Sequence, residues 1–469
     1  MKKNIIKEGQ YAMTQFKKFA EHISSCFSPS AIQEFSQKSK IVKRKRVFTT
    51  DHLLWLCVWQ EKNMGDSSLI DMCASLWQQF GIKISPEGLN QRFNEKSTAF
   101  LKLLFHSILE KQTPDLAAIQ HAYSTHFNRI RILDSTSFQL PNTFSDKYPG
   151  NGGSGKKASV KIHLEYDLTS GEFLSVHIGP GKNNDRQFLP LSGNSILPND
   201  LCIRDLGYFK LADLANWHAS SAYFLSRIKV NTTIYTLNSE ETKKSLRFSS
   251  VELYQYLYKL NPGESTEILE VYLGQKRAFP SRLIIYRLTA DQLKLRRKKQ
   301  EKISAASGFD YKKKTITLSE LNLFITNVPC SKLSLDDVSK FYSLRWQIEL
   351  LFKTWKSYFK IHRAKTSKIE RFDCQLYGRL ISILLSTSLM FQMRQYLYNK
   401  QRKELSELKC MRMIYNKIEE IGCLIRKSAN LTQLAKLLNK IFSTIDWLGT
   451  KCRRYEKPTV FNILFMPSF

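Results

Sequence analysis

The sequence predicts a mixed α/β protein, in which a central mixed sheet carries a β-rich insertion and is flanked by helical regions. Short β-rich runs alternate with helical segments from residue 129 to about 330, whereas apolar residues recur at helical spacing before and after that stretch. The 469 residues also exceed the roughly 250–300 that one compact core accommodates, and the 42 % apolar content can bury several cores. We therefore expect a folded protein of several domains.

The N-terminal region, 1–125, carries helical periodicity without a convincing strand. The segments with this spacing are Tyr11–Phe27, Thr50–Gln60, Ser67–Phe80 and Ser97–Leu109.

The middle of the chain divides into a first part of the core, 126–230, and an insertion, 231–330. The first part reads as a meander of strands at RIRILDST, ASVKIHLEYDL and EFLSVHIG, then strand–helix–strand from Leu201 to Ile228. The insertion reads as the strands SRLIIYRL, KTITL and NLFITNV around the basic helix DQLKLRRKKQEKIS. We expect the strands of 126–230 to form one mixed sheet.

The rest of the chain is predicted to be helical, with a second part of the core at 331–395 and a C-terminal region at 396–469. Two apolar stripes at three-four spacing run from Met411 to Ile425 and from Leu431 to Ile445. Such stripes are more often core than dimer seam, so dimerisation through this region remains one of two interpretations.

The net charge of +31, from 72 Lys and Arg against 41 Asp and Glu, indicates a polyanionic partner. An anionic membrane is one candidate, but the most apolar stretch, Leu380–Met393, is shorter than the roughly 20 residues that a bilayer requires. The N-terminus has no apolar run typical of a signal peptide, and the nine Cys show no paired spacing. We therefore expect a cytoplasmic protein that binds nucleic acid, with no membrane partner and no structural zinc.

Two N-terminal segments are candidates for contacts with DNA. The first is the basic run Lys43, Arg44, Lys45 and Arg46, which could grip phosphates or be a solvated loop. The second is GIKISPEGLNQRFNEK, where Gly81 ends one helix and Ser85-Pro86-Glu87 begins the next. As a helix-turn-helix, it would present Asn90, Gln91 and Arg92 to DNA; otherwise it is simply two packed helices.

Two acids are placed at the ends of buried strands. Asp134 follows Ile130–Leu133, and Asp205 follows Leu201–Arg204. If these strands are neighbours in one sheet, both carboxylates project from the same edge and can hold a hard divalent cation. A third carboxylate is then needed to complete the site.

The third acid is expected on the helix in FYSLRWQIELLFKTWKSYFK. At about 100° per residue, Tyr342, Arg345, Glu349 and Lys356 fall on one face of that helix. Taken alone, this face could be a solvated one with an Arg345–Glu349 pair that contributes a few tenths of a kcal/mol.

The complete pattern resembles the IS4 family of bacterial insertion-sequence transposases, which includes the Tn5 transposase. The family signature of Tyr, two residues, Arg, three residues, Glu, six residues and Lys is present as Tyr342-SL-Arg345-WQI-Glu349-LLFKTW-Lys356. Two further motifs match, Leu133-Asp134-Ser135-Thr136 and Asp205-Leu206-Gly207-Tyr208-Phe209. The acids lie 205 − 134 = 71 and 349 − 205 = 144 residues apart, and the family carries its β-rich domain in the second gap.

The resemblance implies an RNase H-like core in which Asp134, Asp205 and Glu349 are the catalytic triad and hold two Mg²⁺ ions, with Mn²⁺ as a possible substitute. It also implies that Tyr342 and Arg345 contact phosphate near the cleaved end and that Lys356 reaches the DNA backbone. Two-metal phosphodiester chemistry needs no covalent protein nucleophile, which suits a site made of carboxylates.

Relatives of this kind carry a Trp before the Glu helix, which stacks on a flipped base while a DNA hairpin forms. The matching stretch here, Leu321–Asn327, has none. Phe324 could stack instead, although a buried strand Phe is the commoner interpretation, so a hairpin intermediate is left open.

The predicted function is cut-and-paste transposition by an enzyme that binds terminal inverted repeats as a homodimer, cleaves both DNA strands and joins 3′-OH ends to target DNA. One alternative is a catalytically inactive or domesticated relative that acts as a repressor, and another is a stand-alone nuclease. The complete set of acids argues against the first alternative, and the phosphate-contact helix argues against the second.

Overall fold

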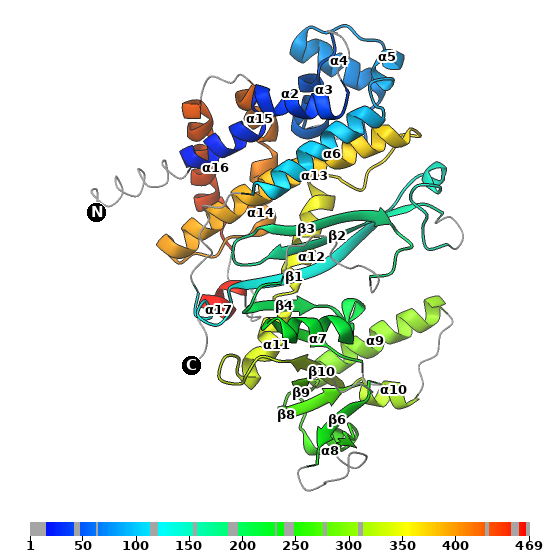
Figure 1. Cartoon of the computed structure of the whole chain (residues 1–469), viewed down its shortest axis with the longest axis vertical. Coiled ribbons are helices and arrows are strands. Elements are labelled where there is room, and N and C mark those ends of the chain that lie inside the picture. Colours follow the sequence, from blue (N-terminus) through cyan, green and yellow to red (C-terminus); the bar gives the residue numbers. More distant parts are fainter. Residues whose placement is uncertain are drawn as a thin grey trace, which may run out of the picture.

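The computed structural model shows a long mixed sheet with a large helical body at one end (Figure 1). The described residues are 16–41, 47–61, 64–112, 121–152, 157–185, 196–229, 232–238, 248–274, 279–307, 313–426, 431–451 and 459–465. The predicted DNA contacts Lys43, Arg44, Lys45 and Arg46 lie outside them.

The sheet has ten strands in the order β3-β2-β1-β4-β5-β10-β9-β8-β6-β7. Their bounds are β1 Arg129–Gln139, β2 Ser159–Asp167, β3 Phe173–Pro180, β4 Asp200–Arg204, β5 Tyr223–Arg227, β6 Ile234–Leu237, β7 Phe248–Ser250, β8 Ser265–Leu273, β9 Pro280–Arg287 and β10 Leu321–Thr326.

The first five strands form the expected RNase H-like mixed core. β1, β2 and β3 are an antiparallel meander, whose second turn places Gly171 at a φ of 79°. β4 then pairs parallel to β1, and β5 pairs parallel to β4 after a crossover through α7 (Leu211–Ala219). A parallel pair requires such a crossover, because a tight hairpin can join only antiparallel strands.

The strands of the predicted insertion extend this core sheet. β10 pairs antiparallel with β5, so that Phe324 lies opposite Arg227. β9 then pairs with β10, and β8 pairs with β9 further towards the edge of the sheet. The basic segment forms α9 (Ala290–Ser307), as predicted. The strand expected at KTITL was wrong: α10 (Lys313–Leu318) is a short helix, and a run of only five residues does not distinguish the two structures by its periodicity.

The N-terminal and C-terminal helices pack together as one helical body. Its elements are α2 Pro29–Lys38, α3 Thr50–Leu54, the π-helix η1 Trp55–Trp59, α4 Leu69–Phe80, α5 Pro86–Asn90, α6 Glu95–Glu110, α13 Ile369–Tyr396, the π-helix η5 Leu397–Gln401, α14 Glu407–Tyr415, α15 Ile418–Arg426 and α16 Leu431–Leu448. The last helix, α17 (Val460–Phe465), lies beside β1 and contacts α11 (Leu335–Ser343) (Figure 1). Both C-terminal apolar stripes are buried in this body apart from Leu431, so they serve as core.

The central helix of the body, α13, is long and apolar enough to cross a membrane, but 89 % of its most apolar window is buried inside the protein. α6 and η1 pack against it. The apolar stretch Leu380–Met393 is therefore part of a buried core helix.

Candidate active site

The sheet register places Asp134 and Asp205 side by side. Leu133 and Arg204 are the last parallel partners of β1 and β4, so the residue that follows each of them is an acid. Asp134 is not at a strand end, as the sequence had suggested. β1 continues to Gln139 and pairs Asp134 with Leu164 of β2, because β2 extends beyond the parallel pairing. The edge where both carboxylates meet is thus the end of β4.

The third acid comes from α12 (Trp346–Ser357), where Glu349 lies in the first turn. The segment that was expected to be one helix is two. α11 (Leu335–Ser343) ends after Tyr342, and Leu344 and Arg345 form a tight turn before α12 begins. The buried face of α12 carries apolar residues such as Ile348 and Trp355, which pack the helix against the sheet.

Arg345 connects all three acids. Its Nη1 donates to Asp134 Oδ2 at 2.6 Å, and its Nη2 donates to Glu349 Oε1 at 2.7 Å. Its Nε lies 3.9 Å from Asp205 Oδ1. The side chains are partly exposed, from 18 % for Arg345 to 44 % for Asp205, so the cluster is open to a substrate from solvent.

Tyr342 and Lys356 flank the cluster. The Tyr342 hydroxyl donates to Asp205 Oδ1 at 3.2 Å, and Lys356 Nζ donates to the Ser137 carbonyl of β1 at 3.1 Å. All four signature residues therefore face the same part of the sheet.

Burial and like charges shift the proton equilibria here. Burial raises the pKa of Asp134 to about 6, with smaller contributions from Asp205 and Glu349, although the Ser135 amide and Arg345 oppose the shift. Burial also raises the pKa of Tyr342, which keeps its hydroxyl a hydrogen-bond donor. Burial opposes the charged form of Arg345, but the surrounding carboxylates outweigh it and raise the pKa of the guanidinium.

The donor set suits a hard divalent cation, because three carboxylates supply oxygen ligands and negative charge. As they stand, no three His, Cys, Asp or Glu side chains among the described residues are grouped to hold an ion. Arg345 accounts for this spacing, since its guanidinium lies between the carboxylates and balances their charge. Asp134, Asp205 and Glu349 are therefore candidate ligands whose present counter-ion is a side chain.

A second polar cluster supports the opposite face of β1 and β2. Ser135 Oγ donates to Asp185 Oδ1 at 3.2 Å, and Lys161 Nζ donates to the same oxygen at 3.1 Å. His163 Nδ1 and the Tyr208 hydroxyl are 2.8 Å apart, and burial lowers the pKa of His163 to about 4. Sequence reasoning missed this cluster, although the alternation in ASVKIHLEYDL places Lys161 and His163 on one face.

Phe324 is buried, with 4 % of its surface exposed, and its ring centroid lies 5.2 Å from that of Tyr342. It is therefore a packing residue beneath Tyr342, and in this structure it is not available to stack on a base.

The predicted contacts in the segment GIKISPEGLNQRFNEK lie elsewhere. Figure 1 places α5 at the far end of the helical body from β1 and β4. α5 has only five residues, so Gln91 and Arg92 fall beyond its end, and the backbone carbonyl of Asn90 accepts from Lys368 Nζ at 2.9 Å. α4 and α5 therefore follow each other across a short turn, as predicted, but the structure does not bring Asn90, Gln91 and Arg92 to the acids.

Comparisons with known proteins agree with the geometry. Residues 125–385 match the transposase DDE domain family. The chain is 40 % identical over 457 residues to the transposase for insertion sequence element IS231F of Bacillus thuringiensis subsp. israelensis, covering 96 % of this chain and 95 % of that protein. It is 32 % identical over 464 residues to the transposase for insertion sequence element IS1151 of Clostridium perfringens, covering 96 % of both proteins. The chain therefore belongs to the DDE transposases of insertion sequences, enzymes that act on DNA and depend on divalent metal ions, and its motifs are consistent with the IS4 family.

Proposed function

We propose that this transposase moves its insertion sequence by a cut-and-paste route that depends on Mg²⁺. The observation that carries the proposal is the convergence of Asp134, Asp205 and Glu349 on one guanidinium at the end of β4. Two Mg²⁺ ions held by these carboxylates would activate the attacking water or 3′-OH and stabilise the leaving oxygen, and Mn²⁺ could substitute for them.

The residues around the acids prepare the site for DNA. Tyr342 holds the Asp205 carboxylate through its hydroxyl, which fixes the direction of one ligand oxygen. Arg345 balances the acids in the metal-free protein, and its guanidinium becomes available to a DNA phosphate once those carboxylates bind cations. A guanidinium suits that second role because it presents paired donors to phosphate oxygens.

The DNA partner is proposed to be the terminal inverted repeats of the element and then the target DNA, in a homodimer that holds two ends together in the cytoplasm. Lys356 lies beside the acids and would contact the backbone. The other proposed contacts to the end sequence are Asn90, Gln91 and Arg92, together with Lys43, Arg44, Lys45 and Arg46. The high positive charge supports binding along a large part of the molecule.

The test is Glu349→Gln, assayed for cleavage and for binding of duplexes that carry the element's own ends. We expect Mg²⁺-dependent cleavage to fall by more than about 100-fold, while DNA binding is retained. Loss of a residue that only supports a metal ligand typically costs about 10- to 100-fold, so a larger loss indicates a ligand. The matched control is Glu420→Gln in α15, because Glu420 forms only an exposed ion pair with Lys417. Cleavage retained by Glu349→Gln would contradict the assignment, and no cleavage by the unaltered protein would favour an inactive relative.

A further inference from the structure

Helix α9 is a strongly basic element that the proposed chemistry leaves unused. It carries the basic residues Lys294, Arg296, Arg297, Lys298, Lys299 and Lys302 against two acids, Asp291 and Glu301, for a net charge of 6 − 2 = +4. Lys294, Lys298 and Lys302 are exposed at successive i, i+4 positions. None of these three has an ion-pair partner in the described part of the chain.

Contacts with the sheet fix which face α9 covers. Gln292 Oε1 accepts from the Tyr286 hydroxyl of β9 at 3.0 Å, and Arg296 Nη2 donates to Asn322 Oδ1 of β10 at 2.7 Å. Asn322 and Phe324 lie on the same face of β10, because strand side chains alternate with a period of two. Phe324 packs on Tyr342, which binds Asp205, so α9 lies on the side of the sheet that bears the acids.

Two arginines where α9 meets the sheet have no acidic partner among the described residues. Arg227 Nη2 and Arg296 Nη2 both donate to Asn322 Oδ1, at 2.9 and 2.7 Å. Neither forms an ion pair with any described residue, and the Nε of Arg227 is buried without a described hydrogen-bond partner. Burial, with a contribution from Arg227, lowers the pKa of Arg296 to about 10.

This arrangement is unfavourable for the protein alone. Like charges at i, i+4 on a helix destabilise it by a few tenths of a kcal/mol per pair, and two guanidiniums that share one neutral acceptor repel each other. An anion placed between the two guanidiniums would relieve their mutual repulsion. A polyanion with regularly spaced charges would in addition follow the line of lysines along α9.

We propose that α9, with Arg227 and Arg296 at its base, is a binding surface for the phosphate backbone of duplex DNA that continues from the catalytic acids. The inference rests on the proposed function, since it takes the same DNA to be the substrate. The contacts are ion pairs with phosphate and read no base sequence. The surface therefore serves any duplex that passes the acids, including target DNA.

The test compares Lys298→Gln/Lys302→Gln with a control, Lys436→Gln/Lys440→Gln, which removes two exposed lysines at the same spacing from α16. The affinity of the full-length proteins for a 40-base-pair duplex of random sequence is measured by fluorescence anisotropy over a salt series. Each lost phosphate contact lowers the slope of log affinity against log salt by about 0.9, so we expect the α9 variant to lose about 1.8. The control should keep the slope of the unaltered protein.

An unchanged salt slope in the α9 variant, or an equal fall of the slope in the control, would overturn the assignment of α9 as a DNA-binding surface. The proposed function would still stand. No DNA binding by the unaltered protein would overturn the proposed function itself. Arg227→Gln gives a second readout that leaves the α9 contacts to the sheet in place. We expect it to weaken binding of the same duplex and to lower the slope by about 0.9, and a normal slope would exclude Arg227 from the surface.

Discussion

The guanidinium of Arg345 lies 2.6 Å from the Asp134 carboxylate, and the same side chain also binds Glu349 and approaches Asp205. One cation of the protein itself therefore occupies the middle of the three acids. This makes the charge balance of the site, as well as its ligands, open to experiment.

Replacing Arg345 with Ala should destabilise the metal-free protein and make its stability more dependent on metal. Hydrogen bonds to charged groups contribute about 1.5–3 kcal/mol each, but these groups are partly exposed, so we expect a total loss of about 1–3 kcal/mol. Thermal unfolding with and without Mg²⁺ is the measurement. Mg²⁺ should raise the Tm of Arg345→Ala more than that of the unaltered protein, and an equal rise in both would contradict a balancing role for Arg345.

The raised pKa of Asp134 predicts that metal binding weakens in mild acid. The carboxyl remains protonated up to about pH 6, and a protonated carboxyl is a poor ligand, so affinity rises with pH through about 6 and levels off above it. Below pH 6, the Mg²⁺ concentration that gives half-maximal cleavage should rise about tenfold per pH unit. Titrations at pH 5.0, 6.0 and 7.5 provide the check, and identical half-maximal concentrations would show that Asp134 is ionised throughout.

Several features of this site could be predicted from the sequence because they depend on local pattern. Helical periodicity predicted that Tyr342, Arg345, Glu349 and Lys356 share one face. A turn at Leu344 and Arg345 divides the helix in two, but the four residues still face the same part of the sheet. The approach of Asp134 to Asp205 was a conditional expectation, since it required β1 and β4 to be neighbours.

Other features depend on long-range pairing that a single sequence does not reveal. β1 runs on past Asp134 because β2 offers it a partner as far as Ser159, and the insertion joins the core sheet because β10 pairs with β5. Arg345 was expected to contact DNA, and its position among the acids follows from how α12 docks. The shared acceptor of Arg227 and Arg296 brings together β5, β10 and α9, which are far apart in the chain.

Lys356→Gln should weaken DNA binding with little effect on folding. Its ammonium donates to the Ser137 carbonyl beside the acids and has no carboxylate partner among the described residues. Burial lowers the pKa of Lys356, because nothing nearby compensates the charge of the ammonium. We expect the salt slope of DNA binding to fall by about 0.9. Lys417→Gln, whose ammonium already pairs with Glu420, is the control and should leave the slope unchanged. A normal slope for Lys356→Gln would exclude it from the DNA interface.

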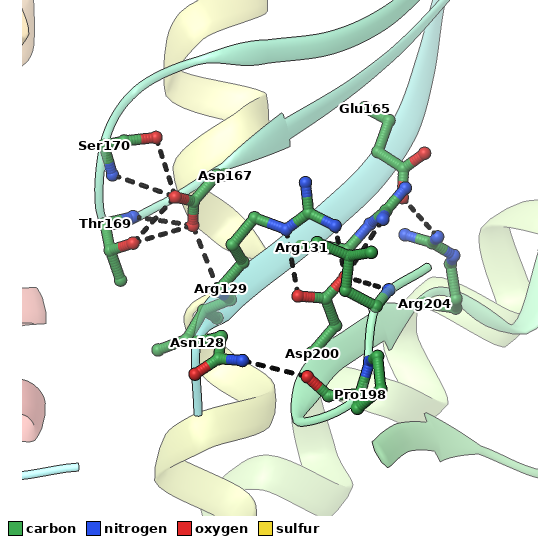
Figure 2. Close-up of polar contacts among 12 residues, drawn as sticks. Asn128, Arg129, Arg131, Glu165, Asp167, Thr169, Ser170, Pro198, Asp200 and Arg204 are labelled. Carbon is green, nitrogen blue, oxygen red and sulfur yellow. Dashed lines mark hydrogen bonds and ion pairs between the residues drawn. The ribbon is translucent and has the colours of Figure 1, made fainter. Parts of the chain in front are cut away.

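The buried ionic network behind β1 predicts a second dependence on pH, this time of folding. Glu165 Oε1 accepts from Arg131 at 3.0 Å and from Arg204 at 2.6 Å, and Arg131 also binds Asp200 at 3.1 Å (Figure 2). Burial alone would raise the pKa of Glu165, but Arg204 and Arg131 outweigh it and lower the pKa to about 2. Since the pKa is lower in the folded state, the stabilisation is complete above about pH 4.5 and is lost as the pH falls towards 2.

Glu165→Gln should therefore destabilise the protein at neutral pH. The substitution removes one partner from a buried pair and leaves Arg131 and Arg204 less compensated, a change that costs about 3–5 kcal/mol. Urea unfolding at pH 7 is the measurement. Glu34→Gln, from the exposed Lys38 pair in α2, is the control and should unfold at the midpoint of the unaltered protein. If the two variants unfold at the same urea concentration, the network contributes no more than a surface pair, and its arginines find other partners when Glu165 is neutral.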